Sequence, residues 1–132
     1  MKSLKDYIYE CLEISESQKT WQTEIIDIAK QFIIEPNYTD FERKDIEKMI
    51  QTKKIDFSLI AYLSEYLGYI VTNKYGDLDF DELVDKFKSK TRKEAYLKLH
   101  DYDEGSNDPE DKEITELIIT GLKKGLAKNK DF

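Results

Sequence analysis

Cysteine, histidine and glycine are all scarce in this chain of 132 residues. The single cysteine, Cys11, has no partner within the chain, which excludes the small secreted domains that depend on internal disulfides. One cysteine and one histidine, His100, also exclude zinc sites built from both residue types at the usual spacing. The five glycines stand singly, so the chain has no glycine-rich phosphate-binding loop.

Long hydrophobic runs are missing as well. The longest candidate, residues 59–71, is interrupted by Ser64, Glu65 and Gly68, and it is shorter than the roughly 20 residues that a membrane span needs. The N-terminus becomes charged again within its first six residues, too early for the apolar region of a signal peptide. The sequence therefore predicts no membrane partner and a cytoplasmic location.

The residues that are present predict one helical domain. Apolar residues make up 39% and charged residues 37% of the chain, enough for a core beneath a strongly charged surface. Apolar positions recur at spacings of three and four, which favours helices, and we find no repeat and no linker. We therefore expect residues 1–132 to form a single all-α bundle of about six helices around a buried central helix. The acidic loop 101–108 is expected to be mobile and the tail 126–132 to be frayed.

Proline and cap residues mark where the predicted helices begin and end. The first helix has no such mark and is predicted from one apolar face, with Leu4, Ile8, Cys11 and Leu12. The second, which begins near Trp21, should end near Pro36, because proline lacks an N–H and forces the preceding residue into an extended conformation. The last should begin after Asp108, with Pro109 at its first position. Capping-box spacing predicts three further starts, at Thr39 with Glu42, Asp79 with Glu82, and Thr91 with Glu94.

Residues 57–71 are apolar on almost every face, which predicts that they form the buried central helix. The end of this helix is ambiguous. Residues 69–72 are rich in strand formers and residues 73–77 are typical of a turn, so a short β-hairpin to residues 78–80 is an alternative.

Candidates for catalysis or metal binding are few. His100 stands alone at the end of a predicted helix, where it suits the helix dipole better than general-base catalysis. Cys11 lies on the apolar face of the first helix and is expected to pack as a small hydrophobe. The acidic stretch from residue 101 has glycine fifth and lysine twelfth, whereas a calcium-binding EF-hand loop needs glycine sixth and glutamate twelfth. We therefore predict no catalytic residue, no cofactor and no metal site.

Charge is more informative. Acidic side chains outnumber basic ones by 28 to 21, a formal net charge of -7, which argues against direct nucleic-acid binding because that needs a basic face. Seven acidic residues and one lysine lie in residues 101–113, a concentration that attracts a basic protein partner. A merely solubilising surface is the alternative, with the interface then on the aromatic faces around Tyr62, Tyr66 and Tyr69. The predicted partner-binding residues are Asp101, Tyr102, Asp103, Glu104, Asp108, Glu110 and Asp111, with Tyr102 as an aromatic anchor.

The first ten residues carry a resemblance to a known peptide. Met1-Lys2-Ser3-Leu4-Lys5-Asp6-Tyr7-Ile8-Tyr9-Glu10 resembles the capsid-targeting peptide of internal head proteins in T-even-like tailed phages, with Met-Lys, a small hydroxyl residue, an acid, an aromatic, Ile and a final Glu. The resemblance implies a phage origin, with Ile8 and Glu10 recognised by the prohead protease and the cut before Cys11. It covers under a tenth of the chain.

Three classes of function fit these observations. In size, acidity and lack of catalytic motifs the chain resembles the anti-CRISPR proteins, which occlude the nucleic-acid channel of a nuclease. We predict a non-enzymatic acidic binding protein, a phage-encoded inhibitor that occludes the basic nucleic-acid-binding surface of a bacterial defence nuclease or of its nucleic-acid complex. The alternatives are an internal or capsid-associated protein of a phage virion, and an immunity protein or antitoxin. Composition does not separate an inhibitor from an immunity protein, since both need only a complementary surface.

Overall fold

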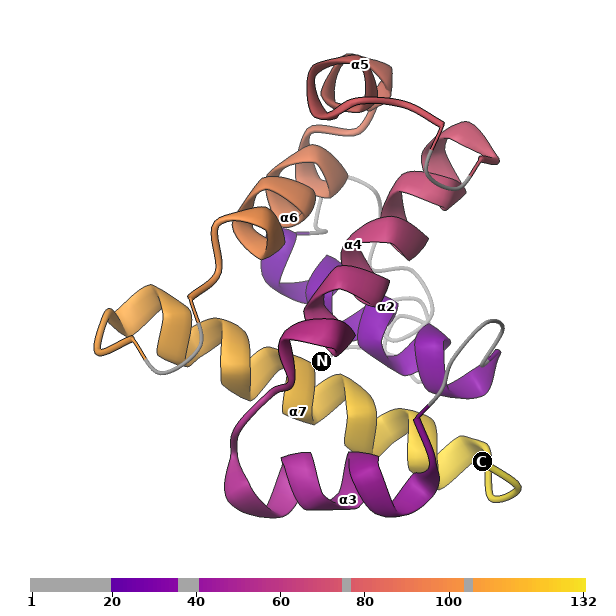
Figure 1. The fold of residues 1–132 in the computed structure, drawn as a ribbon, viewed down its shortest axis with the longest axis vertical. Helices are drawn as coiled ribbons and strands as arrows, with labels where there is room; N and C mark the ends of the chain where they lie inside the picture. The colour runs from indigo at the N-terminus through magenta and orange to yellow at the C-terminus, as the bar shows by residue number, and fades with distance from the viewer. Residues whose placement is uncertain (1–19, 36–40, 75–76, 104–105) are drawn as a thin grey trace, which may run out of the picture.

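The computed structural model describes residues 20–35, 41–74, 77–103 and 106–132. Within these ranges the chain forms α-helices and no β-strand (Figure 1), so the predicted all-α fold is confirmed. The first predicted helix, with Leu4, Ile8, Cys11 and Leu12, lies outside the described residues. The helices are α2 (Trp21–Ile34), α3 (Arg43–Thr52), α4 (Phe57–Thr72), α5 (Phe80–Lys86), α6 (Lys90–His100) and α7 (Pro109–Lys128).

The closest helix packing joins α2 to α7, two helices far apart in the sequence that lie side by side (Figure 1). Gly121 and Gly125 of α7 face α2. A Cβ added at Gly121 would lie 2.6 Å from the Cβ of Ala29, and one added at Gly125 would lie 2.5 Å from the Cβ of Ile33. Because any side chain there would overlap α2, these glycines allow the two helices to approach so closely.

The hydrophobic core is built around this pair. It draws on every described helix except α5, which has no buried residue. The core residues that are at most 2% exposed occupy the inward positions predicted by the helical spacing, together with Ile55 before α4. They include Ile25, Ala29, Ile33, Ile46, Ile55, Leu59, Leu63, Leu67, Ala95, Leu99, Ile114, Ile118 and Leu122.

Helix α4 is less central than predicted. Leu59, Leu63 and Leu67 are buried along one face. On another face Phe57 is 78% exposed, and Ile70, which continues the buried face towards the end of the helix, is 41% exposed. The helix is apolar on most faces, as its sequence indicates, but the rest of the fold covers only one of them.

The alternative of a β-hairpin after residue 68 is wrong in the described residues. Helix α4 continues to Thr72 and ends at Asn73, whose φ of 59° lies in the left-handed region. The backbone N–H of Asn73 donates to the Tyr69 carbonyl, and the Thr72 hydroxyl donates to the Gly68 carbonyl at 3.0 Å. Local hydrogen bonds therefore satisfy this last helical turn, although its residues favour strands.

Three of the predicted helix boundaries are confirmed. Helix α2 ends at Ile34, two residues before Pro36. The Asp79 carboxylate accepts from the backbone N–H of Glu82 at 2.8 Å and so caps α5. Asp108 is the N-cap of α7, with Pro109 at its first position.

Two of the predicted capping boxes are misplaced. Thr39 lies outside the described residues, and α3 begins after Glu42, whose backbone N–H donates to the Asp45 carboxylate at 2.8 Å. Helix α6 begins after Ser89, whose hydroxyl accepts from the backbone N–H of Arg92 at 3.3 Å. The spacing from Ser89 to Arg92 equals that from Thr91 to Glu94, so spacing alone could not decide between the two starts.

The predicted fraying after Gly125 differs from the structure over residues 126–129. Helix α7 continues to Lys128, and Leu126 is buried. The side-chain amide of Asn129 donates to the Ile33 carbonyl at 2.8 Å, and the Arg43 guanidinium donates to the Asn129 carbonyl at 3.3 Å. These two hydrogen bonds hold the end of α7 against the end of α2 and the start of α3.

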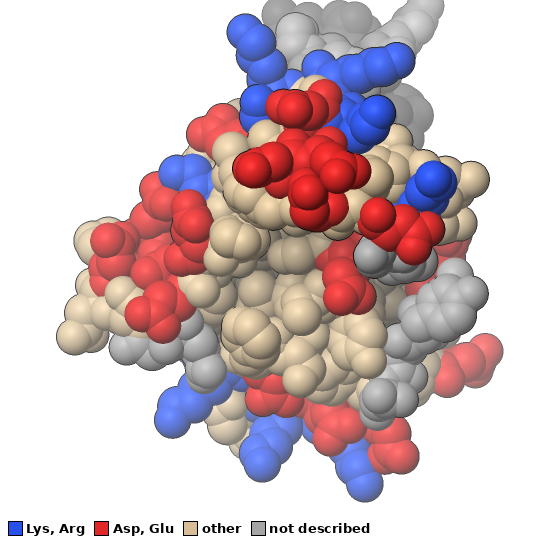
Figure 2. All heavy atoms as spheres, turned by 45° about the horizontal axis from the view of Figure 1, so that its top comes forward, with Lys and Arg blue, Asp and Glu red and all other residues tan. Residues whose placement is uncertain are grey.

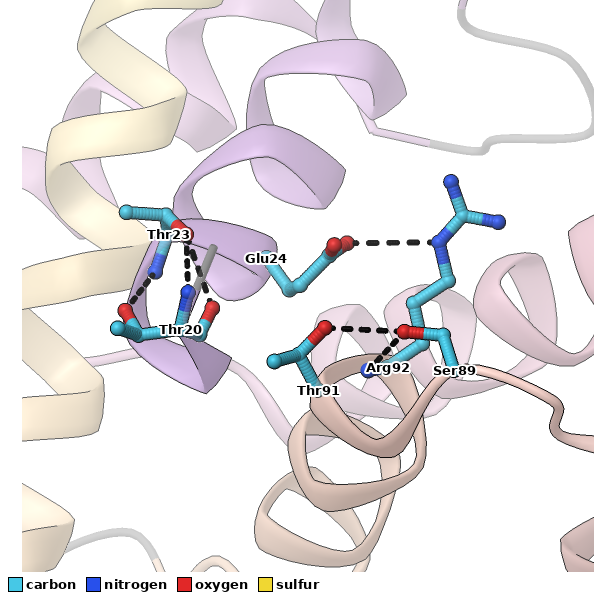
Figure 3. A network of polar contacts seen from close by, with 6 residues as sticks. All are labelled: Thr20, Thr23, Glu24, Ser89, Thr91 and Arg92. Carbon is cyan, nitrogen blue, oxygen red and sulfur yellow. Dashed lines mark hydrogen bonds and ion pairs between the residues drawn. The ribbon is translucent and has the colours of Figure 1, made fainter. Parts of the chain in front are cut away.

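An ion pair with a buried carboxylate joins the first turn of α2 to the first turn of α6 (Figure 3). Glu24, only 6% exposed, lies in the first turn of α2, and its carboxylate is 3.7 Å from Nε of Arg92 in α6. Beside it the backbone N–H of Thr23 donates to the Thr20 hydroxyl at 3.3 Å and caps α2. Because a buried carboxylate is costly without a partner, this pair fixes where α6 crosses α2, and hence where α6 lies against α4.

Candidate functional site

The predicted partner-binding residues surround the turn from α6 to α7. Asp101 follows the last residue of α6, and its side chain is 84% exposed, with one carboxylate oxygen 3.4 Å from Nδ1 of His100. Asp103 is exposed too. Glu104 lies outside the described residues. Asp101 and Asp103 therefore present their charges to solvent, as the prediction requires.

The three predicted residues in and before α7 also have structural roles. Asp108 caps the helix by accepting from the backbone N–H of Glu110 at 2.8 Å. The Glu110 carboxylate accepts from the Lys98 ammonium at 2.8 Å, and this hydrogen bond is the main cause of a raised pKa for Lys98. Asp111 is half-buried in the first turn of α7. Together with Asp101 and Asp103 they form what we call the acidic corner, namely Asp101, Asp103, Asp108, Glu110 and Asp111.

Tyr102 does not stand free as the predicted aromatic anchor. It is half-buried against the core, and its hydroxyl hydrogen-bonds to the Thr115 hydroxyl at 2.5 Å. Thr115 in turn donates to the Asp111 carbonyl at 3.1 Å. The tyrosine therefore holds the acidic corner against α7, and only part of its ring is left at the surface.

A second group of acidic residues, around α5, joins the acidic corner on one face. The sequence predicted Asp79 and Glu82 of this group as the start of a helix and not as part of a binding site. Figure 2 shows acidic side chains in several places on this face, among them two groups with a mainly uncharged hollow between them. We call the second group the α5 acidic cluster; its members, all exposed, are Asp77, Asp79, Asp81, Glu82 and Asp85.

The hollow between the two acidic groups is a groove between α4 and α6, with a volume of about 300 Å³. Its floor includes the buried side chains of Ile60 and Leu99, and Phe57 at its rim is the most exposed large apolar residue described. A second hollow of about 210 Å³ continues it towards α5, because the two share Ser64 and Glu65. We call the first hollow the α4–α6 groove; its lining residues are Phe57, Ile60, Ala61, Ser64, Glu65, Leu99, His100 and Tyr102.

Aromatic contacts attach α5 beside this groove. The Phe80 ring lies 4.3 Å from the His100 ring and 6.0 Å from the Tyr96 ring, centroid to centroid. Phe87, just after α5, lies 5.3 Å from Tyr96. Burial, helped by the carboxylate of Glu65, raises the pKa of the Tyr96 hydroxyl. His100 is therefore packed against a ring as well as near Asp101, and it lines the groove.

The described residues offer little to a metal ion or to acid–base catalysis. Among them no group of three or more His, Cys, Asp or Glu side chains is placed to hold a metal. Cys11, the only candidate thiol, lies outside those residues.

Comparison of the chain with models of protein families, with curated proteins and with solved structures finds no match. None of the described helices has both the length and the apolar character needed to cross a membrane.

Proposed function

We propose that this protein is a non-catalytic binding protein that docks its acidic face onto the basic surface of a protein partner. The observation that carries the proposal is the placement of the acidic corner and the α5 acidic cluster on one face (Figure 2). Acidic side chains gathered in this way steer a basic partner into encounter and select against acidic ones. A chain of net charge -7 is correspondingly unsuited to direct contact with nucleic acid.

The class of partner follows from the same charge argument. Enzymes that bind nucleic acid carry a basic surface for phosphate contacts. We propose that the protein inhibits a bacterial defence nuclease by covering that surface, with a phage as its source and the host cytoplasm as its place of action. A role as an immunity protein would use the same acidic face, and a virion role would rest on residues 1–10.

Capture from a bacterial lysate, followed by competition with nucleic acid, tests this proposal. The full chain is immobilised, the retained protein is identified, and its binding to a labelled nucleic acid is measured with and without added chain. We expect a nucleic-acid-binding protein that loses its labelled ligand as the chain is added. Binding of both ligands at once would contradict occlusion, and a retained capsid protein would favour the virion role.

Charge reversal shows which part of the surface is responsible for binding the partner. Asp101→Lys with Asp103→Lys alters the acidic corner, and Asp81→Lys with Asp85→Lys alters the α5 acidic cluster, without removing a described side-chain cap. We expect each pair to slow association about tenfold at low salt, with a smaller effect at high salt. The matched control, Glu47→Lys with Asp131→Lys, makes the same change of charge at exposed sites in α3 and beyond α7. Equal slowing by the control would show that net charge alone governs binding.

A further inference from the structure

The α4–α6 groove has the length and lining of a site for a helix. With the hollow beside it, the groove borders α4 from Phe57 to Thr72. At a rise of 1.5 Å per residue this part of α4 is roughly 23 Å long, which leaves room for three to four turns of a second helix. Three turns place apolar side chains at positions i, i+3 or i+4, and i+7 along one face.

The lining of the α4–α6 groove is mainly apolar and includes one carboxylate, that of Glu65; the hollow beside it is also lined by Lys74. Phe57 is 78% exposed, whereas Ile60 and Leu99 beneath it are buried. Ala61 also lines the groove, and its small side chain leaves room above Ile60 and Leu99. A large apolar side chain that entered here would remove Phe57 and the floor from water, which favours binding in proportion to the apolar area covered.

The surroundings specify the charge of the ligand. The acidic corner lies at one side of the groove and the α5 acidic cluster at another (Figure 2). We propose that the α4–α6 groove holds a basic amphipathic helix of the protein partner, with a large apolar side chain against Phe57, Ala61 and Leu99. Lysine or arginine side chains of that helix then pair with the two acidic groups. This inference rests on the proposed function, because it assumes that the acidic face is the binding face.

Other occupants match the groove less well. A second copy of the chain would bring acidic groups against acidic groups, at a net charge of -7 on each copy. Residues 1–19 contain four acidic and three basic side chains, so they do not complement an acidic rim. Strand addition needs an exposed sheet edge, and the described part of the chain has no strand.

A synthetic peptide provides the probe. It has about 15 residues, enough for three to four helical turns, with leucine at i, i+3, i+4 and i+7 and lysine at most other positions. A scrambled peptide of the same composition has the same charge without the apolar face. Fluorescence anisotropy with the full chain gives both dissociation constants. We expect the amphipathic peptide to bind at least about tenfold more tightly than the scrambled one.

Two substitutions in α4 locate the binding site. Ala61→Gln keeps the net charge and a good helix former, but it places a longer polar side chain in the groove, so we expect peptide binding to weaken about tenfold. Ile70→Ala is the matched control, because Ile70 is 41% exposed on the same helix and does not line the groove. Its binding should stay within about twofold of the unaltered chain. Circular dichroism confirms that both variants are folded.

Each other outcome has a definite meaning. If Ala61→Gln binds the peptide normally while the charge reversals weaken it, the groove inference is wrong and the acidic binding face stands. If neither set of changes matters, both proposals fail. A dimer in sedimentation that Ala61→Gln abolishes would assign the groove to a second copy. If Leu4→Ser with Ile8→Ser, which keeps the net charge, tightens peptide binding more than about tenfold, the occupant is the chain's own N-terminal segment.

Discussion

The α2–α7 pair and the α4–α6 groove are both built from apolar side chains on helices, yet they present opposite surfaces. In the pair, Gly121 and Gly125 let α7 lie directly against α2, and the side chains around them are buried. Along the groove, by contrast, Phe57 is 78% exposed at the rim of a hollow between α4 and α6. Burial against another helix stabilises the fold, whereas an exposed apolar residue in a hollow contributes little until a ligand covers it. We therefore expect the first region to contribute most to stability, and we propose the second for recognition.

Truncation of a large side chain in each region gives the largest expected contrast. Leu122 of α7 is fully buried, and Leu122→Ala should lower the free energy of unfolding by about 2–5 kcal/mol, through lost burial and the cavity that remains. Phe57→Ala at the groove should change it by less than about 0.5 kcal/mol. Urea denaturation followed by circular dichroism measures both. Similar losses in the two variants would erase the distinction between the regions.

Alanine in place of glycine sharpens the comparison with a smaller change. Gly121→Ala puts a Cβ against the Ile26 backbone and the Ala29 Cβ, and we expect a net loss of about 1–3 kcal/mol from overpacking, despite the roughly 1 kcal/mol that alanine adds to a helix interior. Gly68→Ala is the matched control in α4. Its Cβ would meet only the end of the Leu83 side chain, at 2.9 Å, which is free to turn. Thermal unfolding should show a lower midpoint for Gly121→Ala and an unchanged or higher one for Gly68→Ala.

The smallest effect concerns Tyr96, which lies between the two regions. Burial and the carboxylate of Glu65 raise its pKa above the ordinary value of 10.0. The folded state therefore favours the neutral phenol, and the stability that this contributes is present below about pH 10 and is lost as pH rises through the raised pKa. Tyr96→Phe should flatten the decline of stability above pH 10 and leave its slope between pH 6 and 8 unchanged. An identical alkaline decline in the variant would show that other groups cause it.

The sequence predicted where helices begin and end better than it predicted which other helices cover them. Pro36, Asp79 and Asp108 mark boundaries through their own backbone or side chain, and the structure has those boundaries. The exposed faces of α4 could not be predicted in this way, because periodicity shows that residues are apolar without showing what covers them. Spacing alone likewise could not predict that Ser89, and not Thr91, caps α6.

The sequence predicted the acidic corner but not the other parts of the candidate site. The acidic corner follows from a run of acidic residues in one loop, so the sequence is sufficient to find it. The half-burial of Tyr102 could not be predicted in this way, because its hydroxyl bonds to Thr115, 13 residues further along the chain in the next helix. The α5 acidic cluster is equally visible in the sequence, but its place beside the groove depends on Phe80 packing against Tyr96 and His100, a tertiary contact.

The pairing of α2 with α7 also fixes when the protein can fold. Asn129 bonds to Ile33 across a separation of 96 residues, and contacts between such distant residues slow folding because a long loop must close first. During synthesis the ribosome releases α2 long before α7 has been made. The apolar stripe of α2 is therefore exposed in the growing chain for most of translation, when chaperones bind such stretches. The largest contact of α2 is with α7, so the native core is completed only after α7 has emerged.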